Sequence, residues 1–290
     1  KNIHRLTFLI LPMVFIHSIL LGSTLNRTPA LRIQWFVLIG LYALVVIYRA
    51  SILVWIRSRP FTVAAVDQET HDTWTLAFDG PRPEHYPGQF LFVNLVRNGK
   101  VSESHPYTIS SSPTSERFTI TPKSIGDFSS SVKDTSVGDK AYIEAPFGVF
   151  SYLNSSAQKL AFIAGGIGIT PFMSMLRHMR DTETKREVVL IWGNKSEDDI
   201  AFADELKAME DSMESFRTHH VLSHDDWTGK TPFTGEKGFV DAEKVSNYLG
   251  SPADYEIYVC GPPGMMAKLI PALEEIGVPP SQIRSERFAL

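Results

Sequence analysis

The chain has 290 residues, of which 43% are apolar, and its formal net charge is -4. This length allows about two domains, and the apolar content is typical of an ordered protein. Lysine and arginine are dispersed among carboxylates without a run or stripe, which excludes a nucleic-acid partner. Cys260 is the only cysteine, so internal disulfides and sites built from several thiolates are excluded. We expect the globular part to face a reducing compartment.

Uncharged apolar sequence is concentrated at the start of the chain, between Lys1 and Ile56. Residues 6–26 form a run of 21 without Asp, Glu, Lys or Arg, close to the ~20 residues needed to cross a hydrocarbon core. A second uncharged run, residues 33–48, is extended by the apolar segment 52–56. Both runs are apolar on every face rather than along one stripe, which predicts two membrane spans. Two buried helices of a soluble bundle are the alternative.

The charges around this apolar region predict its orientation. Basic residues are more numerous at its outer ends than in the loop between the two runs. The positive-inside rule therefore places the C-terminal part in the cytoplasm, as the soluble end of an integral membrane protein. The chain opens with Lys1 rather than Met, and we expect it to be the tail of a longer protein.

Two different patterns follow the apolar region. Short β-type runs separated by Gly and Pro fill residues 60–154 and predict a small barrel. Strand-like and helix-like segments alternate over residues 155–290, which predicts an open parallel sheet with helices on both faces. The expected strands of this sheet are residues 159–164, 187–192, 218–222, 255–260 and 283–288, and the expected helices are residues 171–180, 199–213, 241–248 and 263–276.

Three motifs occur in a fixed order along these two regions. The first joins His105-Pro106-Tyr107-Thr108 to the nearby segment Lys123-Ser124-Ile125-Gly126-Asp127-Phe128-Ser129. The second, Gly165-Gly166-Ile167-Gly168-Ile169-Thr170-Pro171, follows an expected strand and opens a helix, which is the context of a phosphate-binding turn. The third, Cys260-Gly261-Pro262-Pro263-Gly264-Met265, lies where another strand ends, at the edge where open sheets bind ligands.

Each motif has an alternative without a ligand. The first would be an ordinary half-buried strand, and the second a tight strand-to-helix turn. Cys260 would be a small buried hydrophobic residue. Taken together, the three motifs resemble the flavin and nicotinamide signatures of the ferredoxin-reductase superfamily, and most closely those of its membrane branch, the ferric reductases and NADPH oxidases.

This resemblance covers nearly the whole chain and implies its domain organisation. Residues 1–59 would be transmembrane helices, two spans of a larger haem domain. Residues 60–154 would form an FAD-binding β-barrel domain, and residues 155–290 an α/β parallel-sheet domain that binds NAD(P)H.

The resemblance also implies roles for single residues. Tyr107 would pack on the flavin and the Thr108 hydroxyl would contact its N5, while Cys260 would lie beside the nicotinamide. Phe288 would cover the other flavin face, although two residues follow it here where the oxidases end on the aromatic. The implied FAD-binding residues are His105, Pro106, Tyr107, Thr108, Thr121, Lys123, Gly126, Asp127, Phe128 and Ser129. The implied NAD(P)H-binding residues are Gly165, Gly166, Gly168, Ile169, Thr170, Pro171, Asn194, Lys195, Cys260, Gly261, Pro262, Pro263, Gly264 and Met265.

The segment of residues 123–129 suits the pyrophosphate of FAD, and we call it the pyrophosphate segment. Its turn enters a helix at Gly126 and supplies backbone amides, and Lys123 supplies the counter-charge. The first helical turn is expected over residues 129–133. After the strand that ends at Trp192, no carboxylate follows at once to bind a ribose 2′-hydroxyl, and Lys195 would face a 2′-phosphate. The nearby carboxylates of residues 197–199 argue against a preference for NADPH. We therefore expect NADPH, or acceptance of both nucleotides.

His4 and His17 are the implied haem ligands, because the fifth span of this family carries two haem-ligating histidines at the same spacing as positions 4 and 17. A helix rises about 20 Å over this spacing, which suits two stacked haems. At about 100° per residue the two side chains point roughly 140° apart, and Pro12 would alter this phase. Each haem b would take its second ligand from a span outside this sequence.

The expected activity is electron transfer from cytoplasmic NAD(P)H through FAD and two b-type haems to an acceptor across the lipid bilayer. Oxygen, giving superoxide, is the first expected acceptor, and chelated ferric iron is the alternative. A second alternative is a membrane-tethered reductase without haem that serves a separate oxygenase or quinone. A third is an inactive domain that serves as an interaction platform.

Overall fold

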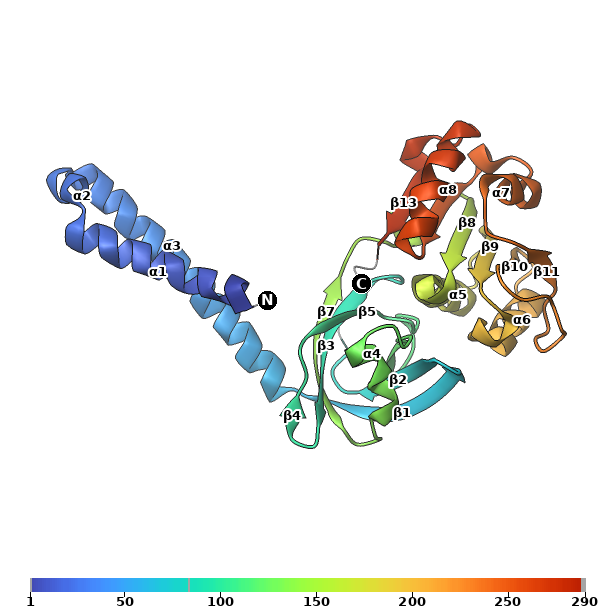
Figure 1. Cartoon of the computed structure of the whole chain (residues 1–290), viewed down its shortest axis with the longest axis horizontal. Helices are drawn as coiled ribbons and strands as arrows, with labels where there is room; N and C mark the ends of the chain where they lie inside the picture. Colours follow the sequence, from blue (N-terminus) through green and yellow to red (C-terminus); the bar gives the residue numbers. More distant parts are fainter. Residues whose placement is uncertain (1, 83, 288–290) are drawn as a thin grey trace. The chain divides into compact units, whose positions relative to one another are not determined.

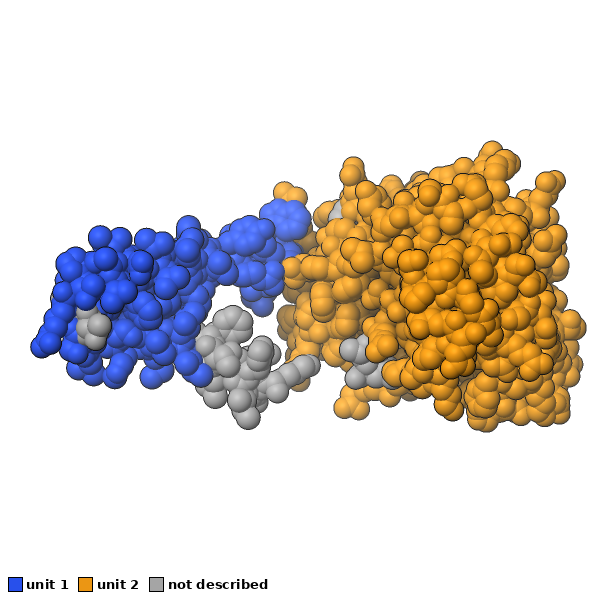
Figure 2. Space-filling model, turned by 90° about the horizontal axis from the view of Figure 1, so that it is seen from above, with its two compact units in different colours: residues 1–58 blue, residues 59–290 orange. Residues whose placement is uncertain are grey.

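The computed structural model describes residues 2–82 and 84–287, and the side chains of residues 2–8, 24 and 26 lie outside this description. The chain divides into two compact units, residues 1–58 and residues 59–290, which Figure 2 colours separately. The first unit is helical, and the second holds every strand found in the described residues.

The first unit consists of α1 (Asn2–Leu21), α2 (Ser23–Arg27) and α3 (Pro29–Ser58). In Figure 1, α1 and α3 lie side by side. Phe15 of α1 is buried because its ring packs against Trp35 and Tyr42 of α3, with centroids 5.5 and 6.0 Å away. Many other apolar side chains of the two helices are exposed, in agreement with runs that are apolar on every face.

The two predicted spans correspond to α1 and α3. The second span is longer than expected, because residues 33–48 and residues 52–56 both belong to the single uninterrupted helix α3. Among the described residues, α3 is long and apolar enough to cross a membrane. Its most apolar stretch of 18 residues has a mean hydropathy of 2.3, and none of this stretch is buried. The described apolar part of α1, Leu9–Leu21, is shorter.

The second unit begins with an antiparallel barrel. Its elements are β1 (Phe61–Thr70), β2 (Thr73–Asp79), β3 (Phe90–Arg97), β4 (Lys100–Val101), β5 (His105–Thr108), β6 (Phe118–Ile120), α4 (Asp127–Ser130), the 3-10 turn η1 (Val132–Asp134) and β7 (Lys140–Phe147). The strand order is β4-β3-β7-β1-β2-β6, with β5 paired to β3, and a bridge between Ile109 and Ile120 closes the ring. The predicted small barrel is therefore present.

Alternation along these strands separates the barrel core from its outer surface. Ile109 and Ile120 lie in the core with Leu76, whereas neighbouring side chains point outward. Thr108 and Ser110 are therefore on the outer surface, next to Ile109. Of the first sequence motif, Pro106 and Thr108 face this surface, whereas Tyr107 packs against the core cluster.

A parallel sheet follows the barrel, as predicted, but it has six strands rather than the five expected, because the short strand β11 (Gly235–Lys237) was missed. Its strands are β8 (Lys159–Gly165), β9 (Glu187–Asn194), β10 (Phe216–Leu222), β11 (Gly235–Lys237), β12 (Glu256–Cys260) and β13 (Ile283–Glu286). The helices are α5 (Thr170–Asp181), α6 (Ala203–Ser212), α7 (Ala242–Leu249) and α8 (Pro263–Glu275). The 3-10 turns are η2 (Tyr152–Asn154), η3 (Gly166–Ile169), η4 (Glu197–Asp199), η5 (Pro252–Asp254) and η6 (Pro280–Gln282).

Both faces of this sheet are covered, which explains why its strands are almost continuously apolar. Phe162 of β8 packs in a cluster with Phe172 of α5 and with side chains of α6. Ile163, the next residue, packs in a second cluster with side chains of α7 and α8. The hydrophobic core of this domain therefore has two layers, one on each face of the sheet.

The strand order β11-β10-β9-β8-β12-β13 defines where a ligand crevice opens. The chain runs outward from β8 to β11 and then returns to place β12 beside β8. Ligands of open parallel sheets bind outside the carboxyl ends of the strands at such a reversal. The second and third sequence motifs lie at these two carboxyl ends, starting at the last residue of β8 and at the last residue of β12.

Candidate active site

The two predicted FAD segments meet at the barrel, where Tyr107 and Phe128 both pack against its core cluster. The His105 ring stacks on Phe128 of α4 with centroids 3.9 Å apart and planes 14° apart, and the Tyr107 ring lies 6.1 Å from Phe128. Two segments that are distant in the sequence therefore form one aromatic surface. Burial raises the pKa of Tyr107 to about 12, so its phenol stays protonated and available as a donor.

The predicted pyrophosphate segment begins its helix earlier than expected. α4 starts at Asp127, two residues before the predicted turn of residues 129–133, because the Ser129 hydroxyl accepts hydrogen bonds from the Ile125 and Gly126 amides, both 3.0 Å long. A side chain added at Gly126 would meet no atom within 4 Å, so its outer side is open to a ligand.

Arg97 is a cation at this segment that sequence reasoning missed. Its guanidinium binds the carbonyl of Ser131 and donates to the Ser131 hydroxyl at 2.8 Å, and it lies 6.0 Å from the Phe128 ring centroid. The available signal was a lone arginine at the end of the apolar strand β3, which pairs with β5.

Lys123 is already paired in the structure. Its ammonium group lies 2.8 Å from Asp199 of η4 and 3.3 Å from Asp72 of the β1–β2 hairpin, and its side chain is 18% exposed. Burial acts to raise the pKa of Asp199, but the bonds from Lys123 and Ser196 outweigh it and hold this pKa below its ordinary value. The predicted role of Lys123 at the pyrophosphate remains a prediction, and it requires these carboxylates to share the ammonium.

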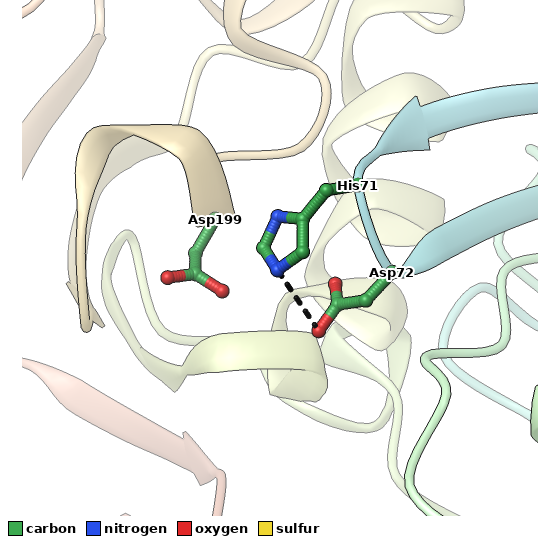
Figure 3. A group of neighbouring side chains, drawn as sticks. All are labelled: His71, Asp72 and Asp199. Atoms are coloured by element: carbon green, nitrogen blue, oxygen red, sulfur yellow. Dashed lines mark ion pairs between the residues drawn. The ribbon is translucent and has the colours of Figure 1, made fainter.

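His71, Asp72 and Asp199 form the cluster drawn in Figure 3. Their ligand-type atoms lie within 4.8 Å of one another, and His71 is 3.6 Å from Asp72. Because the Lys123 ammonium already neutralises the two carboxylates, we assign the cluster to ion pairing between the barrel and the sheet domain.

Thr121, another predicted FAD contact, lies in a row of hydroxyl groups on the outer surface of the barrel. Its hydroxyl is 2.9 Å from that of Ser110 and 3.0 Å from that of Thr75, which donates to Glu69 at 2.6 Å. Thr121 is 3% exposed, so its hydrogen bonds are within the protein. Thr108 is also buried, at 5% exposed.

The two glycine motifs pack directly against each other at the carboxyl ends of β8 and β12. A Cβ added to Gly165 would lie 2.5 Å from the Met265 sulfur, and one added to Gly168 would lie 2.2 Å from the Cys260 carbonyl oxygen. Gly166 differs, because its φ is +51° and an added Cβ would meet nothing within 4 Å. Its carbonyl accepts a hydrogen bond of 2.9 Å from the Trp192 indole.

This packing brings two helix N-termini to one edge of the sheet. α5 begins after the Gly166 turn and α8 begins at Pro263, each with Pro in its first turn. Backbone amides at such ends bind phosphate oxygens. The diphosphate site that the sequence motifs predict at this strand reversal remains a prediction.

Cys260 is fully buried, and burial followed by the nearby Glu286 carboxyl raises the pKa of its thiol. The thiol is therefore a poor nucleophile, as expected. Glu286 is opposite Cys260 on β13, and burial raises its pKa as well. A cavity of about 270 Å³ adjoins Glu286 and the chain segment of Phe150 and Ser151. Phe288, the predicted gating residue, lies outside the described residues.

The carboxylates after β9 all have partners. Glu197 accepts hydrogen bonds from the four consecutive backbone amides of residues 228–231, and the bond from the Thr228 amide is the main cause that lowers the pKa of Glu197. Asp198 pairs with Lys230 at 2.7 Å, and Asp199 with Lys123. Asn194 is 6% exposed, and its amide atoms have no hydrogen-bond partner in the described structure.

Of the predicted haem ligands, the structure describes only the His17 side chain, which is exposed on α1. The side chain of His4 lies outside the described residues. The histidines of β10 are packing residues: His219 stacks on Tyr248 with centroids 4.1 Å apart, and His220 stacks on Phe233 at 4.0 Å.

Comparison with known proteins agrees with this geometry. A family profile described as an FAD-binding domain matches residues 70–191, and one described as an oxidoreductase NAD-binding domain matches residues 162–269. The flavohaem-like FAD/NAD-binding domain of nitric oxide dioxygenase from Vibrio cholerae O1 biovar El Tor superposes with a TM-score of 0.70 at 20% identity, over 79% of this chain and 98% of that chain. This likeness shows the fold.

Two relatives are similar in sequence. The glycine betaine monooxygenase reductase subunit of Chromohalobacter salexigens is 30% identical over 230 residues, which are 77% of this chain and 62% of that protein. NADH-cytochrome b5 reductase 1 of Mortierella alpina is 31% identical over 197 residues, 66% of this chain and 64% of that protein. The chain spans less than two thirds of the length of these relatives. It carries the FAD-binding and NAD-binding domain pair of NAD(P)H-dependent oxidoreductases with the ferredoxin-reductase-like fold.

Proposed function

We propose that this chain is a membrane-anchored, NAD(P)H-dependent flavin reductase that delivers electrons to a separate redox protein, an oxygenase component or a cytochrome. The observation that carries the proposal is the aromatic surface of His105, Tyr107 and Phe128, which lies in the same compact unit as the crevice at β8 and β12. The two relatives, a monooxygenase reductase subunit and a cytochrome b5 reductase, support a protein acceptor over oxygen or ferric chelate.

The residues at the site have the chemistry that this function needs. FAD, when bound, accepts a hydride from NAD(P)H and passes its two electrons on one at a time. Tyr107 supplies a flat ring for the isoalloxazine, and the Thr108 hydroxyl supplies a hydrogen bond. The turn at Gly166 and the start of α8 bind the nucleotide diphosphate through backbone amides. Cys260 is a fully buried packing residue with a raised thiol pKa, and it is not a nucleophile.

We assign acceptance of NADPH as well as NADH to the segment after β9. Each carboxylate of η4 is held by a partner within the protein, so none is free for a ribose 2′-hydroxyl. Lys195 lies two residues before this turn and is exposed, which suits a 2′-phosphate. The change Lys195→Glu is therefore expected to weaken NADPH binding selectively, and an equal effect on NADH would contradict the assignment.

Membrane anchoring is the function proposed for the first unit. α3 has the length and apolar composition of a span, and the basic residues at the outer ends of the apolar region support a cytoplasmic position for the redox domains. Recovery of the full chain in the membrane fraction after an alkaline carbonate wash supports this anchoring. Recovery in the soluble fraction contradicts it.

Reconstitution of the full chain with FAD tests the reductase proposal. Under anaerobic NADPH or NADH, the reduced protein is offered a cytochrome b5, a [2Fe–2S] oxygenase component, a quinone, ferric citrate and oxygen in separate reactions. Fast oxidation by one of the two proteins supports the proposal. Fast oxidation by oxygen or ferric citrate alone contradicts it, and absence of FAD binding supports the interaction platform instead.

A transmembrane flavocytochrome is the second candidate, and one observation favours it. His17 projects from α1 without being covered by α3, as a haem ligand shared with another span requires. In this candidate His4 and His17 hold two haems, and the acceptor across the bilayer is oxygen or ferric chelate. Reduced haem bands in protein purified from its native membrane, with one haem lost in His17→Ala, would establish it. A spectrum with flavin bands alone excludes it.

A further inference from the structure

One face of α5 is bonded to the chain segment that follows the flavin motif. The Ser174 hydroxyl donates to the Ser111 carbonyl at 2.7 Å, and the Arg177 guanidinium donates to the Ser110 carbonyl at 2.6 Å. One turn further on, Asp181 accepts a hydrogen bond from the Thr114 hydroxyl. These side chains are at positions i, i+3 and i+7, so they share one helix face. α5 also begins at the glycine turn of the nucleotide crevice.

Arg177 is the most tightly held member of this face. Its Nε and Nη2 atoms lie 2.9 and 2.5 Å from the two carboxylate oxygens of Glu205 in α6, and its guanidinium lies 5.0 Å from the Phe202 ring centroid. The Arg177 side chain is 14% exposed. Burial acts to raise the pKa of Glu205, but Arg177 outweighs it and keeps the pKa below its ordinary value, so the pair stays charged.

The geometry of this contact depends on the arginine fork. Two nitrogens bind the Glu205 carboxylate in parallel, and a third binds the Ser110 carbonyl. Lysine carries the same charge but has no planar fork, so it cannot reproduce the three contacts at once. Phe202, beneath the guanidinium, has a φ of +57°, a left-handed conformation that persists only where its surroundings enforce it.

Arg177 lies at the edge of a junction between the two domains in which Ser111 and Ser174 are buried. A cavity of about 350 Å³ adjoins the guanidinium and is lined by Glu69, Arg177, Ile200, Phe202, Ala203, Asp204 and Glu205. Glu69 comes from the barrel, and the others come from the sheet domain. The Arg177 hydrogen bonds therefore act at this junction together with the Ser174–Ser111 hydrogen bond and the close approach of Met175 to Gly88.

We propose that Arg177 is a positioning residue for hydride transfer. It fixes the Ser110 carbonyl, two residues beyond Thr108, relative to the helix whose first turn receives the nucleotide. It thereby sets the distance between the flavin held at Tyr107 and Thr108 and the nicotinamide held at the β8–β12 crevice. The inference rests on the proposed reductase function. Reacting atoms must come within about 3–3.5 Å, and a misplacement of 1 Å costs about 10²-fold in rate.

The test uses the full chain loaded with FAD and the variants Arg177→Lys, Arg177→Gln and Glu205→Gln. The matched control is Arg117→Gln, which removes an exposed arginine–aspartate pair, 2.7 Å long, within the barrel. Anaerobic stopped-flow absorbance gives the rate of flavin reduction at saturating NADPH. The long-wavelength charge-transfer band with NADP⁺ reports stacking of the two rings. The rate of amide hydrogen exchange of residues 105–115 in FAD-free protein reports how firmly the Arg177 contacts fix this segment.

We expect flavin reduction to slow by about 10- to 100-fold in Arg177→Lys and Arg177→Gln, with normal FAD content, a weaker charge-transfer band and faster exchange of residues 105–115. Glu205→Gln should change the reduction rate, the charge-transfer band and the hydrogen exchange in the same directions. Arg117→Gln should change none of the three. Reduction within about twofold of the unmodified chain in both Arg177 variants overturns the proposal. Loss of FAD or of folding in Arg177→Lys also overturns it, because the role is then structural only. If the unmodified chain is not reduced by either nucleotide, the proposed function itself fails.

Discussion

The contact between the two glycine motifs makes Gly168→Ala a sharp test of the nucleotide crevice. The added Cβ would lie 2.2 Å from the Cys260 carbonyl oxygen, 2.6 Å from its carbon and 2.9 Å from the Gly261 nitrogen, where ordinary contact begins at 3.4 Å. All three are backbone atoms, so no side-chain rotation relieves the clash. The backbone of the loops after β8 and β12 must therefore shift until the 2.2 Å contact approaches 3.4 Å.

The expected cost follows from this shift. Overpacking of this kind typically costs about 1–3 kcal/mol of unfolding free energy. A displacement of about 1 Å at the site also predicts a loss of roughly 10²-fold in the rate of flavin reduction by NADPH. Thermal unfolding followed by tryptophan fluorescence suits the first measurement, because the Trp192 indole bonds to the Gly166 carbonyl of the same turn.

Gly264→Ala is the matched control for stability. Gly264 belongs to the same pair of motifs, an added Cβ meets nothing within 4 Å, and its backbone is helical in α8. Alanine there should be neutral or stabilise by up to about 1 kcal/mol. If Gly168→Ala is as stable as Gly264→Ala and is reduced at the rate of the unmodified chain, the two loops do not form the close junction described here.

Three further predictions concern single side chains. Thr108→Val should slow flavin reduction while the thermal unfolding temperature stays unchanged; an unchanged rate would remove its hydroxyl from the site. Because burial lowers the pKa of His220 to about 3, the unfolded chain binds the additional proton between pH 6.5 and 3, and stability should fall by about 1.4 kcal/mol per pH unit as pH drops through this window. His220→Phe should remove that part of the acid dependence, measured by denaturant unfolding at several pH values, and an identical dependence would refute it. Cys260, whose thiol pKa is raised, should react with iodoacetamide only after unfolding, and rapid labelling of the native chain, detected by mass, would contradict its burial.

The sequence predicts the ends of most sheet strands to within about two residues, but not the contact between the two glycine motifs. Glycine at positions 165 and 168 is required by the close approach of the third motif, and glycine at 166 by a left-handed backbone. The alternation of apolar strands and helices is sufficient to predict a parallel sheet covered on both faces. The position of the crevice then follows from the order of the strands.

Contacts between distant segments are less visible in a sequence. The charge on Lys123 suggests a pyrophosphate ligand, but the fold brings Asp72 and Asp199 to it from two other elements. Arg97 and Arg177 belong to no motif, and their partners Ser131, Ser110 and Glu205 are identified only once the elements are in place. From the sequence alone, the acidic run of residues 197–199 argues against binding of NADPH. In the folded chain, each of these carboxylates has its own partner.

Anaerobic addition of NADPH, and separately NADH, to the full chain reconstituted with FAD tests the central claim most directly. If the aromatic surface on the barrel and the crevice of the sheet form one redox site, stoichiometric FAD binds and its oxidised absorbance is lost on mixing with at least one nucleotide. A chain that takes up no FAD, or that holds FAD in its oxidised form with both nucleotides present, would contradict the claim.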